Sequence, residues 1–444
     1  MGSNMAECHP VAFRWPLSAK TERGAVLMHV DPRFTRTSAL CDLHVPIRAG
    51  SDIVFLGGII RHVLESERWN GDPFFREYVA HFTNAATLVS PDFKDTEELG
   101  GVFSGLSGDG ERYDNATWAY QRHPPPAPPG GRPGTLSDLL LRKLPGRPKT
   151  DPSMKDPRCV LQVVRRHFAR YTPEMVERVC GCPKEGFLRV AETLLANSGR
   201  ERTSNVTYAV GWTQHTVGVQ IIRTAAMLQA LLGNIGRPGG GVLALRGHAT
   251  IQGSTDIATL YHSLPGYLNM PDARKAHDTL EDFVVTEAAP VAASFWGNYP
   301  KFIVSYLKAQ FGEAATAEND YGYDYHPKIT GDHSHMPMFL AMAEGKIRGL
   351  LVMGQNPAVG GQNARLQRKA LAKLEWMVVR DFFETETAAF WRNSPEVKSG
   401  KLSPKDIRTE VFFLPAAALP EMDGTFTNTQ RLVQAHDKAV DPPD

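Results

Sequence analysis

The stretch from Gly233 to Asp256 reads GNIGRPGGGVLALRGHATIQGSTD, and its glycines directly follow a long apolar segment. Glycine allows the backbone to approach a large ligand closely. Arg246 stands in this stretch with no acidic residue nearby in sequence, and a guanidinium is the planar charged group best suited to holding a small carboxylate. Arg246 is therefore the first candidate active-site residue. The alternative is an arginine in a surface loop, paired with an acid from elsewhere in the chain.

The composition is that of a large globular protein. The chain has 444 residues, of which 22% are charged, and a net charge of +1, so it is long enough for two to three domains. This charge balance gives no electrostatic reason to expect nucleic-acid binding, and no apolar run is long enough to cross a bilayer. The N-terminal segment MGSNMAECHP lacks the charged and apolar parts of a signal peptide.

The cysteines and one histidine pair are the candidate metal ligands of the chain. The chain has five cysteines, Cys8, Cys41, Cys159, Cys180 and Cys182. Their odd number and the absence of C-x-x-C spacing predict no disulfide framework and no zinc or iron–sulfur site. The close pair Cys180 and Cys182 falls between two predicted helices and is interpreted as structural. The segment DHSHM at 332–336 can ligate a metal, but a solvated loop before a helix is the favoured interpretation.

Four apolar segments predict strands, at 25–31, 205–211, 349–353 and 375–381. Helices are expected near 53–64, 173–179, 183–196, 217–232, 302–311 and 336–343. Each strand ends in a polar or glycine-rich turn, which is the layout of a doubly wound α/β sheet that presents its strand ends to one extended ligand or to two. None of the turns matches the glycine fingerprint of an NAD site or a P-loop. The alternative is four ordinary strand-to-helix turns.

The turn after the first strand, DPRFTRTS, places Asp31, Arg33 and Arg36 where a nucleotide would bind. Gly50, Ser51 and Asp52 precede the helix near 53–64, although Ser51 or Asp52 can also be a simple helix cap. Residues 92–156 are rich in glycine and proline and include HPPPAPPGGRPG at 123–134. They are interpreted as an inserted surface excursion.

Several long motifs together resemble the molybdopterin-dependent formate dehydrogenase major subunit of the respiratory, membrane-associated kind. They are the opening GSNMAECHPVAFRW to VDPRFTRTSA segment, GWTQHTVG, LLGNIGRPGGGVLALRGHATIQGSTD, SLPGYL, FWGNYPKF and MGQNP. Within the superfamily, the formate dehydrogenase assignment rests chiefly on LRGHATIQG and GWTQH. The resemblance implies two αβα domains of the DMSO reductase-like superfamily, residues 1–248 with the insertion and residues 249–444, each of which binds one guanine dinucleotide.

The resemblance also implies a cofactor and its contacts. Such enzymes hold molybdenum or tungsten between two pterin guanine dinucleotides and oxidise formate to carbon dioxide. Arg246 would anchor the formate carboxylate, and His248 would lie beside the metal and handle a proton or polarise substrate. Asp52 can accept hydrogen bonds from guanine, and Arg33 can meet phosphate. The matching positions are Asn4, Glu7, Asp31, Arg33, Gly50 and Asp52 for one dinucleotide, Gly211, Trp212 and Gln214 for the pterin, and Gly354, Asn356, Asp381 and Thr385 for the second dinucleotide.

Two departures from the family pattern matter. The family begins with a cysteine-ligated four-iron cluster domain and a cysteine or selenocysteine metal ligand followed by histidine, and this chain has neither. Cys8-His9 imitates that pair but matches the loop after a later strand, so no metal ligand is assigned. The chain also ends before the family's C-terminal pterin-binding domain.

Met1 matches the end of a strand whose beginning is absent, which suggests a gene model begun at an internal methionine, downstream of a UGA codon for selenocysteine. Such a fragment is expected to expose apolar surface, to bind pterin weakly and to oxidise no formate by itself.

The resemblance further implies an iron–sulfur electron-transfer subunit, a membrane cytochrome subunit and a periplasmic location within a membrane-associated complex. Molybdenum and tungsten cannot be distinguished, because both use the same pterin. Three functions stay open: a formate dehydrogenase, another molybdopterin oxidoreductase such as a nitrate or thiosulfate reductase, and a non-catalytic pterin-binding scaffold.

Overall fold

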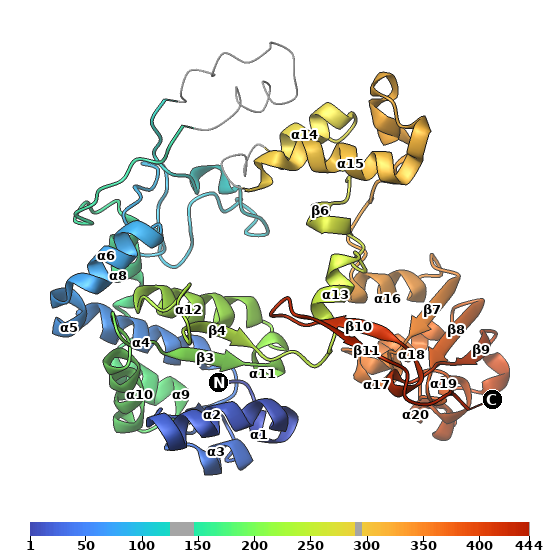
Figure 1. Ribbon diagram of the computed structural model, residues 1–444, viewed down its shortest axis with the longest axis horizontal. Coiled ribbons are helices and arrows are strands. Elements are labelled where there is room, and N and C mark those ends of the chain that lie inside the picture. The colour runs from blue at the N-terminus through green and yellow to red at the C-terminus, as the bar shows by residue number, and fades with distance from the viewer. Residues whose placement is uncertain (125–145, 289–294, 444) are drawn as a thin grey trace. The chain divides into compact units, whose positions relative to one another are not determined.

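The computed structural model describes residues 1–124, 146–288 and 295–443, which form two compact units (Figure 1). Unit 1 contains the described residues up to Arg246, and unit 2 contains those from Gly247 onward. Most of the proline-rich segment at 123–134 lies outside the described residues.

Unit 1 combines two pairs of parallel strands with helices. The strands are β1 (Met28–Val30), β2 (Leu43–Val45), β3 (Asn205–Tyr208) and β4 (Gly241–Ala244). The helices are α1 (Met5–Cys8), α2 (Pro10–Arg23), α3 (Arg36–Leu40), α4 (Asp52–Glu65), α5 (Glu67–Gly71), α6 (Pro73–Phe82), η1 (Asn115–Thr117), α8 (Val160–Phe168), α9 (Pro173–Cys180), α10 (Lys184–Ala196), α11 (Val210–Thr213) and α12 (Gly218–Leu231). Strand β1 pairs with β2, and β3 pairs with β4. The N-terminal amino group reaches the second pair, where it donates to the carbonyl of Thr207 at 2.9 Å.

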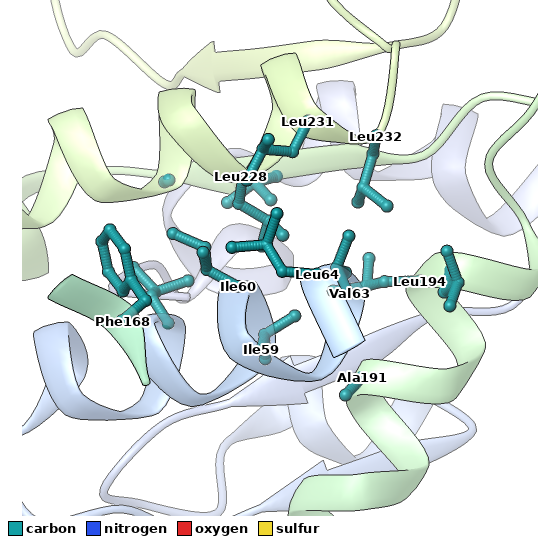
Figure 2. Packing of buried hydrophobic residues seen from close by; sticks show 14 of the residues in the cluster. Ile59, Ile60, Val63, Leu64, Phe168, Ala191, Leu194, Leu228, Leu231 and Leu232 are labelled. Carbon is teal, nitrogen blue, oxygen red and sulfur yellow. The ribbon is translucent and has the colours of Figure 1, made fainter. Parts of the chain in front are cut away.

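Helix α4 forms the centre of the unit 1 core. Its buried residues Ile59, Ile60, Val63 and Leu64 recur at helical spacing, which explains why the sequence forms an amphipathic helix here. Figure 2 shows these side chains between the leucines at the end of α12 on one side and Ala191 and Leu194 of α10 on the other. Because α4 is packed on both sides, the position of its first residue, Asp52, is fixed as well.

Gly58 lies where α4 packs against Val176 of α9 and Phe187 of α10. A Cβ at this position would lie 2.5 Å from Val176 Cγ2 and 2.9 Å from Phe187 Cζ. We expect Gly58→Ala to lower the free energy of unfolding by about 1–3 kcal/mol, because the added methyl overpacks this contact. Gly71→Ala is the matched control, since a Cβ there meets nothing within 4 Å. Urea unfolding followed by circular dichroism measures both, and an equal response of the two variants would contradict the packing argument.

Unit 2 is built around a parallel sheet with the order β7-β8-β9. Its strands are β5 (Ser263–Leu264), β6 (Leu268–Asn269), β7 (Gly349–Met353), β8 (Trp376–Asp381), β9 (Glu410–Pro415), β10 (Gly424–Thr427) and β11 (Val433–His436). Its helices are α13 (Ile251–Asp256), η2 (Pro265–Tyr267), α14 (Leu280–Ala288), η4 (Phe295–Asn298), α15 (Tyr299–Phe311), η5 (Gly312–Ala314), η6 (Ala317–Tyr325), α16 (His335–Ala343), α17 (Pro357–Gly360), α18 (Ala364–Leu371), α19 (Phe390–Asn393), α20 (Pro395–Lys398), η7 (Pro404–Asp406) and η8 (Leu419–Glu421).

The two faces of this sheet have different environments. Val352, Met377 and Val379 are buried in one cluster with Phe339 of α16 and Leu371 of α18. On the other face, Leu351, Met353 and Leu414 are 63%, 68% and 50% exposed. Parallel sheets are normally covered on both faces. The uncovered face agrees with the expectation that this chain exposes apolar surface.

Most predicted elements are confirmed, and the fold is α/β with parallel strands as predicted. The strand predicted over 205–211 is too long, because β3 ends at Tyr208 and Val210–Thr213 form the short helix α11. The chain bends here because the carbonyl of Gly2 accepts hydrogen bonds from the amides of both Ala209 and Gly211. His335 of the DHSHM segment is the first residue of α16 rather than part of the loop before it.

Candidate functional site

The carboxyl ends of β1 and β3 meet at the N-terminal segment. The carbonyl of Gly2 accepts from the amides of Ala209 and Gly211, each at 3.1 Å. The next carbonyl, of Ser3, lies 2.9 Å from His29 Nε2 on β1. The turns that follow the two strands therefore lie at one edge of unit 1, which is the edge where open α/β folds bind ligands.

Asn4 and Glu7 lie together at this edge. The side-chain amide of Asn4 donates to the Glu7 carboxylate, and its Oδ1 accepts from Thr37 Oγ1 at 2.8 Å. Thr37 also accepts from the amide of Ala6 at 3.0 Å, and the Glu7 carboxylate lies 3.5 Å from Arg36 Nε. These contacts join α1 to α3, so Asn4 and Glu7 form one polar surface with Arg36 and Thr37.

Asp31 and Arg33 occupy the turn after β1. Asp31 Oδ1 accepts from the amide of Arg33 at 2.9 Å, and this bond shapes the turn. The Arg33 side chain is exposed and makes no hydrogen bond or ion pair with any described residue. Its guanidinium is therefore available to an anionic group of a ligand.

The buried ring of His29 on β1 joins Ser3 of the N-terminal segment to Ser38 of α3. Because a carbonyl only accepts, Nε2 donates to the carbonyl of Ser3, and Nδ1 then accepts from the Ser38 hydroxyl at 2.7 Å. The ring is 3% exposed, and burial lowers its pKa from the ordinary value of 6.5. The folded protein therefore keeps His29 neutral at a pH where the unfolded chain binds a proton there.

This difference predicts a pH dependence of stability. The contribution of neutral His29 is complete above pH 6.5 and is lost as the pH falls through and below that value, because the unfolded state then binds more protons. We expect the free energy of unfolding to fall between pH 7.5 and about 5.5, and His29→Gln to flatten that slope. His81→Gln, at an exposed site, is the control. Urea titrations at several pH values measure the slope, and an unchanged slope in His29→Gln would contradict the assignment.

Gly50 lies in the turn after β2, and Asp52 is the first residue of α4. Gly50 has φ +86° and a Cβ built on it meets nothing within 4 Å, so the turn borders open space. Asp52 is 6% exposed, and its Oδ1 accepts from Trp212 Nε1 at 2.8 Å. Trp212 is fully buried and stacks on Tyr208 with ring centroids 5.2 Å apart. Trp212 therefore lies behind the Asp52 carboxylate and orients it.

Gly211 and Gln214 lie on the turn beside Trp212. A Cβ on Gly211 would lie 2.7 Å from the carbonyl oxygen of Gly2, and a Cβ on Gly2 would lie 2.7 Å from Trp212 Cδ1. Only glycines fit this contact between the N-terminal segment and α11. Gln214 is exposed just after α11.

Arg246 follows the end of β4. The amide of Leu245 donates to the carbonyl of Tyr208 at 2.8 Å, so the β3–β4 ladder extends to the residue before it. The exposed Arg246 guanidinium has no hydrogen bond or ion pair within the described parts of the chain, and the same holds for the exposed ring of His248. Arg246 is the last residue of unit 1, and His248 belongs to unit 2. The acidic partner considered for Arg246 is thus not found among the described residues.

In unit 2, Gly354 and Asn356 follow β7. Gly354 has φ +61°, and its amide donates to the carbonyl of Arg380 at 3.1 Å. Asn356 Oδ1 accepts from the Thr387 amide at 3.1 Å and the Thr387 hydroxyl at 2.8 Å, while its Nδ2 donates to Glu386 at 2.7 Å. These bonds join the turns after β7 and β8.

Asp381 is the last residue of β8, and Thr385 lies in the turn that follows. Asp381 Oδ1 accepts from the Phe382 amide at 2.8 Å, and its carbonyl accepts from Ala416, just after β9. All three strand ends therefore meet at one edge of unit 2. Thr385 Oγ1 is buried there without a hydrogen-bond partner in the described residues, whereas buried hydroxyls are normally paired.

The N-terminal segment at the unit 1 edge carries two further buried polar atoms without a partner in the described chain, Ser3 Oγ and His9 Nδ1. Neither residue is among the ligand contacts predicted from the sequence. The only signal there is the polar run SNMAECHP, which does not show which atoms lack partners in the folded chain.

The sulfur atoms take no part in this arrangement. All five cysteines are free thiols, and Cys8 is exposed. Cys180 and Cys182 are buried, and the Cys180 thiol donates to the carbonyl of Ser51 at 3.5 Å. Among the described residues, no group of three or more histidine, cysteine or acidic side chains is arranged to hold a metal ion, and no helix is long and apolar enough to cross a membrane.

The sequence matches a protein family and several named proteins. The profile of the molybdopterin oxidoreductase family matches residues 1–390. The chain is 43% identical over 447 aligned residues to the nitrate-inducible formate dehydrogenase major subunit of Escherichia coli, covering 100% of this chain and 41% of that protein. It is 42% identical to formate dehydrogenase 2 subunit alpha (cytochrome c-553) of Nitratidesulfovibrio vulgaris, covering 100% of this chain and 41% of that protein. It is also 42% identical to the formate dehydrogenase subunit alpha of Megalodesulfovibrio gigas, covering 98% and 40%. Among solved structures, acetylene hydratase from Pelobacter acetylenicus aligns with a TM-score of 0.49 and 15% identity, covering 98% of this chain and 43% of that one.

Proposed function

Because the chain belongs to the molybdopterin oxidoreductase family, we propose that it is the central part of a formate dehydrogenase catalytic subunit, which oxidises formate to carbon dioxide. The observation that carries the proposal is the unpaired guanidinium of Arg246 beside the polar strand edge of unit 1. The proposal is supported by relatives named formate dehydrogenase that are 42–43% identical to the chain. The chain spans about 41% of the length of these relatives, so the activity is proposed for the enzyme completed to that length.

Family membership implies a molybdenum or tungsten pterin cofactor, and the residues at both strand edges fit such a group. At the unit 1 edge, Asp52 has Oδ2 without a hydrogen bond from the described residues and could accept guanine N–H groups, while Arg33 could meet phosphate. Gly50 borders open space for such a ligand. Asn4, Glu7 and Asp31 would complete this contact surface, with Trp212 behind Asp52 and Gly211 and Gln214 on the pterin side.

The unit 2 edge has the same kind of features. Gly354 leaves open space beside its turn, and Thr385 Oγ1 lacks a partner in the described residues. Asn356 and Asp381 flank these two positions. We assign a second guanine dinucleotide to this edge, which gives the two-dinucleotide form of the cofactor.

The reaction removes a proton and two electrons from formate and leaves carbon dioxide. The bound metal–pterin group supplies the electron acceptor. Arg246 holds the carboxylate through paired N–H donors and so fixes the direction of the C–H bond. His248, two residues on, takes the released proton as a general base.

The partners and location are proposed from the resemblance. They are an iron–sulfur electron-transfer subunit, a membrane cytochrome subunit and a periplasmic site within a membrane-associated complex. The four-iron cluster and the cysteine or selenocysteine metal ligand are assigned to segments that this sequence does not include.

The test compares the 444-residue chain with the enzyme completed to the length of its relatives. Metal and pterin contents are measured on both proteins, and dye reduction is measured with formate. The completed enzyme is expected to contain metal and pterin and to reduce the dye with formate, whereas the chain alone is expected to be inactive. Turnover of nitrate or thiosulfate without formate oxidation would instead identify another reductase. Pterin without any turnover would identify a binding scaffold.

A further inference from the structure

His9, in the N-terminal segment at the unit 1 edge, forms a hydrogen bond with Arg246. Its Nε2 lies 3.3 Å from the carbonyl oxygen of Arg246, a residue 237 positions later in the chain. The bond holds the peptide group from which the Arg246 side chain departs. No other hydrogen bond to that carbonyl is found in the described residues.

The backbone of His9 is itself well fixed. Its amide donates to the carbonyl of Met5 at 2.8 Å and closes α1, while its carbonyl accepts from Phe13 at 2.9 Å at the start of α2. Pro10 occupies the first position of α2, where its fixed φ suits a helix start. The backbone of His9 is therefore held between two helices, and α1 also carries Glu7, whose partner Asn4 stands at the N-cap position of that helix.

The chemistry of the ring assigns its tautomer. A carbonyl oxygen only accepts, so Nε2 carries the hydrogen and Nδ1 carries the lone pair. Nδ1 is buried and has no partner in the described residues. An unpaired buried nitrogen destabilises the folded state, so Nδ1 does not account for a histidine at position 9. The nitrogen that accounts for it is Nε2, which donates to the carbonyl of Arg246.

We propose that His9 is a positioning residue, whose Nε2–H holds the Arg246 carbonyl so that the guanidinium stays aimed at the substrate carboxylate. His9 does not touch substrate and is not a metal ligand. The importance of this bond for turnover rests on the proposed formate dehydrogenase function. The bond itself is tested on the chain without any cofactor.

The first test is limited trypsin digestion of the folded chain, because trypsin cleaves after arginine and the Arg246–Gly247 bond is exposed. We expect His9→Asn, whose amide is too short to reach Arg246, to raise the cleavage rate there about threefold to tenfold. His9→Gln, whose amide nitrogen can occupy the position of Nε2, should restore the wild-type rate. His81→Gln, at an exposed residue of α6, is the matched control.

The Arg348–Gly349 bond of unit 2 is the internal reference, since it joins the same two residue types at the start of β7. Faster cleavage at Arg246 alone supports the proposal. Equal acceleration at both bonds would mean general unfolding and would overturn it, as would an unchanged rate at Arg246 in His9→Asn.

The second test uses the completed enzyme. His9→Asn is expected to raise KM for formate about threefold to tenfold with a smaller change in kcat, because a loosened anchor weakens substrate binding, and His9→Gln should rescue KM. A variant that merely folds less well loses kcat at constant KM, and that result would overturn the positioning role. If the wild-type enzyme oxidises no formate, the proposed function fails, while the digestion experiment still decides whether His9 holds Arg246.

Discussion

Arg246→Ala is expected to lower kcat/KM for formate in the completed enzyme by about 10²–10³-fold, the range found when one preorganised charge-stabilising donor is removed from an active site. The guanidinium has no partner in the described residues, so its removal leaves no buried acid behind and should cost little folding stability. Arg246→Lys keeps the charge but loses the planar pair of donors, and it should fall between the wild type and the alanine variant.

Arg223→Ala is the matched control for this prediction. Arg223 is also an exposed arginine of unit 1 without a hydrogen bond or ion pair in the described chain, but it lies on α12. Formate-dependent dye reduction over a range of formate concentrations measures all three variants, alongside their metal and pterin contents. An Arg246→Ala enzyme with wild-type kcat/KM and full cofactor content would remove Arg246 from its proposed role and favour another molybdopterin oxidoreductase.

Trp212→Ala is expected to lower the free energy of unfolding of unit 1 by about 3–5 kcal/mol. The substitution removes the indole ring of a fully buried residue and leaves a cavity in its place. It also removes the indole N–H that donates to Asp52. Trp212→Phe keeps an aromatic ring against Tyr208 but leaves the carboxylate unpaired, and we expect a loss of about 1–3 kcal/mol.

Trp15→Ala provides the comparison, because Trp15 is 64% exposed on α2. Its effect should stay within about 0.5 kcal/mol. Urea unfolding followed by far-ultraviolet circular dichroism measures the three variants without depending on tryptophan fluorescence. A Trp212→Phe variant as stable as the wild type would show that the bond to Asp52 contributes nothing, and Trp212 would then be only a core residue.

The same residues show how far the sequence predicts the site. Asp52 was predicted at the start of a helix because apolar residues recur at helical spacing after it, and α4 begins there. The helix expected near 173–179 is α9, which begins at Pro173, and the Thr172 side chain caps it by accepting from the amide of Met175. Trp212 was predicted to line the pterin, whereas its burial depends on Tyr208, Asp52 and Gly2, none of which is marked in the sequence as its neighbour.

The amino-acid sequence by itself determined the α/β class, most helices and strands, and the family through its long motifs, because these depend on residues close together in the chain. The tertiary structure alone decided which side chains meet. His9 lies against Arg246 across 237 positions, Trp212 against Asp52 across 160, and Asn356 against Thr387 across 31. Such contacts form when strands and helices pack, and whether a polar atom is left without a partner is set by that packing and not by its neighbours in sequence.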